Sequence, residues 1–248
     1  MTVRNHFAIL KNLRNIKEAG VSSEHMKKLR RSFLDPSWEK AMTVPIDFIK
    51  AQKYMPEFSR EIETAMLSSC KGFPKLPGFT IFIVDVSGSM GAPMSGKSEF
   101  NRMEAAAAMT VLAAEMCEHI SVYATAGSDS YRKHQTAKIN PLRGFALSEK
   151  ILEAQHRLGG GGIFTRQALE YVKEHEKETP DRIVVFSDSQ DCDWENSRKP
   201  NPFGKYNYIV DVSNHQHGIN YKGVWTAEVS SWSEGFLKYI AASEQCLN

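Results

Sequence analysis

A nearly continuous apolar segment that ends in an aspartate constrains the fold of this chain most strongly. Residues 79–85 read FTIFIVD, and residues 182–188 read RIVVFSD. Segments of this kind are typical of strands that are buried on both faces of a parallel sheet. Ligands of such sheets bind at the carboxyl ends of the strands, which is where Asp85 and Asp188 fall. The two segments therefore predict a parallel sheet with a candidate site at its carboxyl edge.

Strand and helix patterns alternate around these two segments. Further strands are expected at residues 120–125, 131–139, 206–212 and 224–230, and helices at residues 101–118, 148–157, 166–178 and 233–243. Such alternation predicts an α/β fold, a doubly wound and mostly parallel sheet flanked by helices on both faces. We assign this domain to residues 76–248.

Residues 1–75 show a different pattern, that of several short helices. Phe7, Leu10, Leu13 and Ile16 recur every three residues, as one face of a helix requires. Residues typical of helix ends and starts divide the segment further: Gly20, Ser22, Asp35, Pro36, Pro45 and Pro56. The segment is too short to bury these apolar faces in a core of its own. We expect another chain, or a second copy of this one, to cover them.

The charge of the chain is unevenly distributed. Residues 1–75 hold 14 Lys and Arg against 8 Asp and Glu, whereas residues 76–248 hold 17 against 21. A basic segment beside an acidic domain indicates nucleic acid as one partner of the segment. The candidate contacts are four basic residues of one predicted helix: Lys27, Lys28, Arg30 and Arg31. A solvated helix surface explains the same excess and remains the alternative.

The composition argues against several classes of protein. No apolar run approaches the ~20 residues of a membrane span, so we expect no membrane contact. Residues 1–15 lack a signal-peptide pattern because Lys11 and Arg14 interrupt their apolar residues. The four cysteines form no CxxC pair, which argues against a zinc or redox motif. A reducing, cytoplasmic setting is the expectation.

The candidate site is a motif of alternate polar residues that follows the first buried strand. Asp85, Ser87 and Ser89 alternate along the chain, so a carboxylate and two hydroxyls can point the same way. Hard oxygen ligands of this kind, completed by water, suit Mg²⁺ or Mn²⁺. The motif gains its weight from its position directly after a buried strand.

The sequence IVDVSGSM around this motif resembles the first loop of the metal-ion-dependent adhesion site of von Willebrand factor A domains. The resemblance implies a threonine from a second loop, matched by Thr165 in TRQAL, and an aspartate from a third, matched by Asp188 in FSDSQ. It further implies that Ser87 and Ser89 bind the metal directly, that Thr165 does so in some states, and that the aspartates act mainly through water. One coordination place is then left for an acidic side chain of a protein partner.

The sequence departs from this family pattern in both later loops. Residues 159–162 are all glycine, which predicts an unusually flexible second loop. Arg166 follows the threonine, and Ser189 stands where the family usually has glycine. These departures leave the affinity for the metal and the identity of its ligand open. The alternative is a site without metal, in which Asp85 and Asp188 cap loop amides.

A wider resemblance covers nearly the whole chain. The segments AILKNLRNIKEAGVS, VPIDFIKAQKYMPEF and KGFPKLPGFTIFIVDVSGSM are similar to the Ro autoantigen family, also called the TROVE module. The resemblance implies a ring of helical repeats that leads into an A-type domain and binds small structured RNAs and single-stranded RNA ends. Residues 1–75 correspond only to the last helices of such a ring, so the family's RNA-binding residues cannot be transferred.

Other candidate groups have simpler explanations beside the functional ones. His215 and His217 could bind a metal, but they fall in a predicted loop. Asp191 and Asp193 form either a second cation site or an exposed acidic loop. Trp38 and Tyr54 either stack on bases or anchor the core. No nucleophile with a nearby base is identifiable, so we expect no enzyme. We expect a non-enzymatic, divalent-metal-dependent binding module of the Ro type in a larger assembly that can contain RNA. The alternative is a protein–protein adhesion or structural assembly component without RNA.

Overall fold

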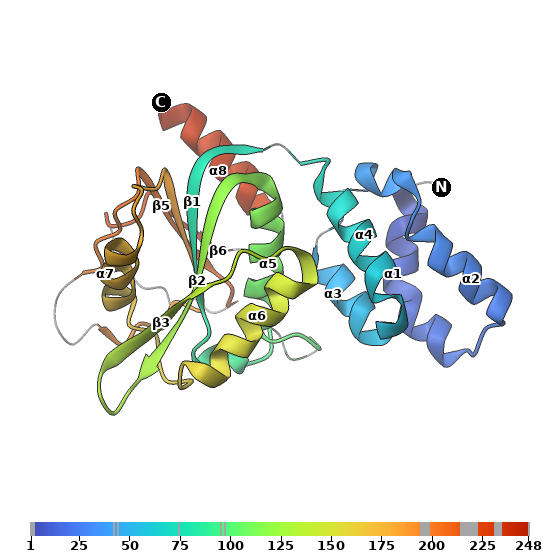
Figure 1. Cartoon of the computed structure of the whole chain (residues 1–248), viewed down its shortest axis with the longest axis horizontal. Helices are drawn as coiled ribbons and strands as arrows, with labels where there is room; N and C mark the ends of the chain where they lie inside the picture. The colour runs from blue at the N-terminus through green and yellow to red at the C-terminus, as the bar shows by residue number, and fades with distance from the viewer. Residues whose placement is uncertain are drawn as a thin grey trace.

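Two parts follow each other along the chain, and Figure 1 shows them side by side. We call residues 1–75 the helical segment and residues 76–248 the sheet domain. The computed structural model of the chain describes residues 3–41, 43, 45–73, 75–94, 96, 98–193, 199–213, 223–230 and 235–247.

The sheet domain is built on a six-stranded sheet with the strand order β3-β2-β1-β4-β5-β6. Its strands are β1 (Leu76–Asp85), β2 (Cys117–Ser128), β3 (Lys133–Ile139), β4 (Arg182–Ser187), β5 (Tyr206–Asp211) and β6 (Ala227–Ser230). The edge strand β3 runs antiparallel to β2, and all other neighbouring strands are parallel. In the register of β1 and β4, Val84 lies opposite Phe186, so both strands end at the same edge of the sheet. The predicted fold class is confirmed.

Helices cover both faces of this sheet. They are α5 (Arg102–Met116), α6 (Gly144–Arg157), α7 (Thr165–His175) and α8 (Gly235–Leu247), and the short η3 (Gly88–Gly91) follows β1. Figure 1 shows α5, α6 and α8 on one side of the sheet and α7 on the other. Strand β1 explains this arrangement, because Phe82 and Val84 pack on the α5 side whereas Ile81 and Ile83 pack on the α7 side. Burial on both faces is the reason for its continuous apolar sequence.

The helical segment consists of short helices whose ends follow the sequence. They are α1 (Val3–Glu18), α2 (Ser23–Ser32), η1 (Pro36–Lys40), α3 (Pro45–Tyr54), η2 (Pro56–Phe58) and α4 (Ser59–Cys70). Gly20 lies beyond α1 at a φ of 59°, and the Ser22 side chain accepts a hydrogen bond that caps α2. Among the described residues, no helix has the length and apolar character to cross a membrane.

The helical segment and the sheet domain share one hydrophobic cluster. Trp38, Phe48 and Ile62 are fully buried in the cluster that also contains the apolar side chains of α5 and α6. The Glu63 carboxylate accepts a hydrogen bond of 2.8 Å from the backbone of Phe145 at the start of α6. The expectation that another chain covers the apolar faces is therefore corrected for these residues. Trp38 is buried within the helical segment against Phe33 and Phe48, whereas α3 packs on α5, and α4 packs on α5 and α6. The large apolar side chains of the segment that stay exposed are Phe7, Val21 and Leu34.

Candidate metal centre at the carboxyl edge of the sheet

The first loop of the candidate centre folds around the buried carboxylate of Asp85. Its Oδ1 accepts a hydrogen bond of 2.8 Å from the Ser87 backbone, and its Oδ2 accepts one of 2.8 Å from the Ser187 hydroxyl. The resulting turn brings the hydroxyl oxygens of Ser87 and Ser89 within 3.3 Å of each other. The structure thus brings together the carboxylate and both hydroxyls of the first motif.

Asp188, the aspartate of the third loop, is paired with an arginine that the sequence analysis did not identify. Its Oδ2 lies 2.7 Å from Nη1 of Arg102, and its side chain is completely buried. The same Nη1 lies 3.4 Å from the backbone oxygen of Ser89. The Oδ1 of Asp188 accepts a weaker hydrogen bond of 3.3 Å from the Gln190 backbone. Arg102 therefore joins the third loop to the first.

Thr165, the threonine of the second loop, is the first residue of α7 and is 2% exposed. Among the described residues, its hydroxyl has no hydrogen-bond partner. A buried hydroxyl without a partner is unfavourable by about 1–3 kcal/mol, so such groups point to a ligand or an ion. Within the described part of the chain, the Thr165 hydroxyl makes no hydrogen bond to the other four candidate ligands. The Thr165 backbone is joined to the third loop through Asp191.

The glycines at residues 159–162 let the three loops approach closely. A Cβ atom on Gly88 would lie 2.8 Å from the backbone oxygen of Gly160, closer than real Cβ atoms come. The Gly161 backbone donates a hydrogen bond of 3.0 Å to the backbone oxygen of Gly127 in β2. The glycines therefore allow close backbone packing, in addition to the flexibility that their sequence predicts.

Asp191 and Asp193 cap the N-terminus of α7. Asp191 accepts a hydrogen bond of 3.1 Å from the Thr165 backbone, and Asp193 accepts one of 3.1 Å from the Gln167 backbone. Carboxylates at this end of a helix interact favourably with its dipole. Asp193 is 1% exposed, so the interpretation as an exposed acidic loop is wrong for this residue.

Ser189 adopts a left-handed backbone conformation, with a φ of 63°. This conformation favours glycine, the residue that the resemblance leads one to expect here. Serine in this conformation carries an energetic cost of about 1–2 kcal/mol that glycine would avoid.

A third strand also ends in an aspartate, Asp211, which the sequence analysis missed. The pentapeptide IVDVS occurs at residues 83–87 and again at residues 209–213, and this repeat was the available signal. Asp211 accepts hydrogen bonds of 2.7 Å from both the backbone and the hydroxyl of Ser213. It lies opposite Ser187 in the sheet register, beside the third loop. His215 and His217 follow this strand and lie outside the described residues.

The electrostatics of the edge favour a bound cation. Burial raises the pKa of Asp85 to about 7, with a smaller contribution from Asp188, against the hydrogen bonds from Ser87 and Ser187. Burial also raises the pKa of Asp211, and Asp188 adds to it. A cation near these groups would stabilise their charged forms.

The donor set fits a hard cation. The described residues contain no group of three or more His, Cys, Asp and Glu side chains that could hold a metal, so a site here depends on hydroxyl oxygens. Such ligands suit Mg²⁺ or Mn²⁺. Asp85 and Asp188 also accept loop amides, as the alternative without metal requires. The unpaired Thr165 hydroxyl is the observation that this alternative leaves unexplained.

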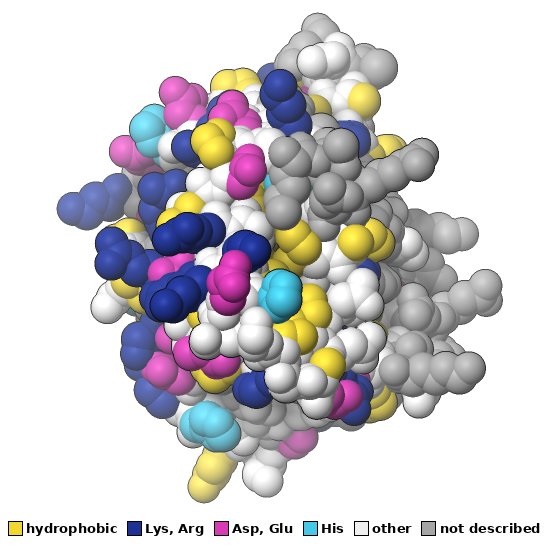
Figure 2. All heavy atoms as spheres, turned by 90° about the vertical axis from the view of Figure 1, so that its right-hand side faces the viewer, with side chains coloured by type: hydrophobic (Ala, Val, Ile, Leu, Met, Phe, Trp, Pro, Cys, Tyr) yellow, Lys and Arg dark blue, Asp and Glu magenta, His cyan; other side chains and the backbone are white. Residues whose placement is uncertain are grey.

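The four basic residues proposed for RNA lie on α2, none of whose residues is buried. Lys27, Lys28, Arg30 and Arg31 are all exposed. Lys28 pairs with Glu24 at 2.9 Å, and Arg30 with Glu61 at 2.8 Å. Figure 2, which looks onto the helical segment, shows Lys and Arg side chains gathered on one side with acidic side chains among them. Trp38, by contrast, is buried and donates to the Ser32 oxygen, so it anchors the core.

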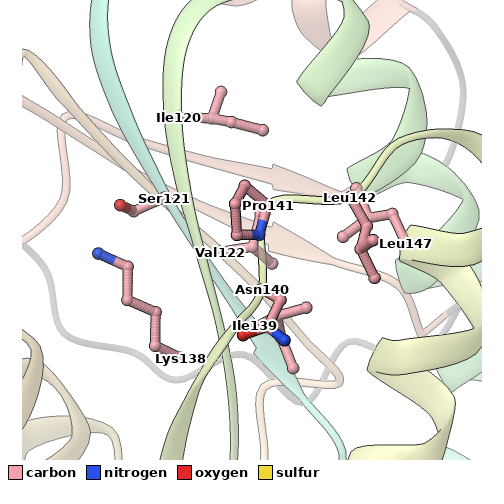
Figure 3. A pocket seen from close by; sticks show the side chains of 9 residues that line it. All are labelled: Ile120, Ser121, Val122, Lys138, Ile139, Asn140, Pro141, Leu142 and Leu147. Carbon is pink, nitrogen blue, oxygen red and sulfur yellow. The ribbon is translucent and has the colours of Figure 1, made fainter.

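A hollow of about 210 Å³ lies away from these loops, beside the first half of β2 and the end of β3. Figure 3 shows Ser121 and Lys138 at one side of it and Leu142 and Leu147 at the other. The Lys138 ammonium already pairs with Glu176 at 2.7 Å. The hollow therefore offers no unpaired charge and is separate from the candidate centre.

Comparison with known proteins agrees with the fold of the chain. Residues 80–190 match the von Willebrand factor type A domain family. The whole chain is similar in structure to the Ro (RSR) protein of Deinococcus radiodurans, with a TM-score of 0.62 and 16% identity over 94% of this chain and 51% of that chain. The chain thus spans about half of that protein, and the likeness establishes the fold. A similarity to the PilB minor pilin of Streptococcus sanguinis is too weak to carry an argument, with a TM-score of 0.43 and 15% identity over 70% of this chain and 62% of that one. No curated protein matches the chain.

Proposed function

We propose that this chain, whose residues 80–190 match the von Willebrand factor type A domain family and which has the fold of a Ro protein, is a non-enzymatic binding module that holds a divalent cation. The observation that carries the proposal is the buried, unpaired hydroxyl of Thr165 at the start of α7. The glycine loop before it packs at Gly160 against Gly88, which lies between Ser87 and Ser89. The cation would be Mg²⁺ or Mn²⁺, with Asp85 and Asp188 acting mainly through water.

The proposed ligand of the module is an acidic side chain of a protein partner. The direct ligands Ser87, Ser89 and Thr165 are neutral, and Arg102 already pairs with Asp188, so a bound cation would leave the centre with an excess of positive charge. A carboxylate from a partner supplies the missing negative charge and a further oxygen ligand.

The hairpin between β2 and β3 supports such a partner. Tyr131 at its tip is 84% exposed, and its neighbours Arg132 and Lys133 are also exposed. The Arg132 guanidinium donates a hydrogen bond of 2.8 Å to the backbone oxygen of Cys192, and this bond fixes the hairpin beside the third loop. An aromatic side chain and positive charges at the rim of a site are suited to an acidic protein surface.

The test is a melting curve with and without Mg²⁺. A ligand that binds only the folded state raises the melting temperature, so millimolar Mg²⁺ should stabilise the wild type. Asp85→Ala should abolish the increase, and Glu149→Ala, which removes an exposed carboxylate of α6, should keep it. A protein partner that co-purifies from the native source should be released by EDTA. A wild type that does not respond to Mg²⁺ or Mn²⁺ would contradict the proposal.

RNA binding is a second candidate function, favoured by the four exposed basic side chains of α2. If they contact phosphates, neutralising all four should weaken binding to different RNAs about equally. The slope of log affinity against log salt should fall by roughly 0.7 per lost contact with single strands. The matched control neutralises four exposed lysines of the sheet domain: Lys150, Lys173, Lys177 and Lys205. Equal affinities of the α2 variant and the wild type would refute this candidate, and no RNA binding by either leaves protein adhesion.

A further inference from the structure

The candidate metal centre already contains a positive charge, the guanidinium of Arg102. Its side chain is 9% exposed and lies between the Asp188 carboxylate, at 2.7 Å, and the Ser89 backbone oxygen, at 3.4 Å. The backbone at this position is fixed, because Arg102 opens α5 directly after a capping box formed by Asn101 and Glu104. The arginine is therefore held against two of the five candidate metal-site residues.

The position of Arg102 changes the charge balance of the centre. With both carboxylates ionised and no cation bound, Asp85 and Asp188 carry two negative charges and Arg102 compensates one of them. With a divalent cation, positive charge exceeds negative charge by one. The field of the guanidinium extends to the third aspartate of the edge, since burial raises the pKa of Asp211 and Arg102 acts in the opposite direction.

We propose that Arg102 limits the affinity of the centre for a divalent cation by compensating Asp188, which leaves the cation-bound centre with an excess positive charge for a partner's carboxylate. The inference rests on the proposed function. Two like charges in a buried place repel each other strongly even at a protein-like dielectric constant. Among the described residues, Nε of Arg102 has no hydrogen-bond partner, so its acceptors do not fully saturate the guanidinium.

The test is a titration with Mn²⁺ alone, in which electron paramagnetic resonance measures the free ion. Arg102→Gln should bind Mn²⁺ about tenfold or more tightly than the wild type, because a repelling charge is removed. Arg102→Lys should stay close to the wild type. The matched control is Arg60→Gln, which removes the same charge from an exposed position on α4 and should leave the affinity unchanged.

A double variant separates the effect of charge from that of folding. Arg102→Gln alone leaves the buried Asp188 unpaired, which lowers stability. Arg102→Gln with Asp188→Asn leaves neither charge unpaired, so it should be more stable than Arg102→Gln alone. It also removes a candidate ligand, so it should bind Mn²⁺ more weakly than Arg102→Gln alone. A structural ion pair would not produce this pattern of affinities.

The outcomes distinguish the two proposals. If the wild type binds Mn²⁺ and Arg102→Gln binds it equally or more weakly, the inference about Arg102 is overturned while the cation site stands. If neither the wild type nor any variant binds Mn²⁺, both proposals are overturned. Tighter binding by Arg102→Gln than by the wild type, with weaker binding by the double variant than by Arg102→Gln, supports the inference.

Discussion

Replacing Asp85 with asparagine removes a buried negative charge but keeps the shape of the side chain. The amide oxygen can still accept from the Ser87 backbone. In the wild type, the Ser187 hydroxyl donates a hydrogen bond to Asp85. In the variant, this hydroxyl can rotate and accept a hydrogen bond from the amide nitrogen of the asparagine. The variant therefore isolates the charge of the candidate ligand from its hydrogen bonds.

The magnitude follows from the pKa of Asp85. Burial raises this pKa from 3.8 to about 7, a difference of about three units, or about 4 kcal/mol at about 1.4 kcal/mol per unit. Between these two pH values the folded state binds the proton more tightly than the unfolded state. The free energy of unfolding of the metal-free protein should therefore fall as the pH rises from 4 to 7, by up to this amount. A bound cation keeps the carboxylate charged and offsets the loss.

Urea unfolding at about pH 5 and pH 8, in EDTA and in Mg²⁺, measures the effect. In EDTA, the free energy of unfolding of Asp85→Asn should lack the part of the fall between the two pH values that comes from Asp85. The variant should therefore be more stable than the wild type at the higher pH. Mg²⁺ should stabilise the wild type and leave the variant unchanged. Asp35→Asn is the control, because hydrogen bonds from Ser37 lower the pKa of this half-buried carboxyl group and place its titration below this range. If Asp85→Asn were less stable than the wild type by the same amount at both pH values, the reasoning would be refuted.

Three further predictions concern the fold around the site. Ser189→Gly should change the free energy of unfolding by less than about 1 kcal/mol, because the relief of strain at positive φ offsets the greater conformational entropy that glycine loses on folding. Ser187→Gly should lower the free energy of unfolding, because it removes the hydroxyl that is hydrogen-bonded to Asp85. Phe48→Ala should lower stability by about 3–5 kcal/mol, and circular dichroism should still show one transition because both parts share a core. Arg182→Gln should cost about 3–5 kcal/mol in chemical denaturation, because it leaves the buried Glu244 without its ion-pair partner; a loss below about 1 kcal/mol would contradict this.

The elements that could be predicted from the sequence are those in which residues adjacent in the chain are all buried in the same apolar surroundings. The apolar runs before Asp85 and Asp188 predicted β1 and β4 because a strand buried on both faces needs an unbroken apolar sequence. Arg102 was not predictable, since its partner Asp188 is 86 positions away and only the helix start before it has a local signature. The burial of α3 and α4 was missed for the same reason, because they pack on α5 and α6, which lie far away in the sequence.

The central claim is that the hydroxyl of Thr165 is a ligand of a divalent cation. Thr165→Val replaces that hydroxyl with a methyl group of nearly the same shape, and isothermal titration with Mg²⁺ compares the two proteins. We expect the wild type to bind Mg²⁺ and the variant to bind it more weakly. The metal-free variant should be at least as stable, because a buried unpaired hydroxyl, which costs about 1–3 kcal/mol, is gone. Equal Mg²⁺ affinities for the two proteins, or no binding by the wild type, would contradict the account.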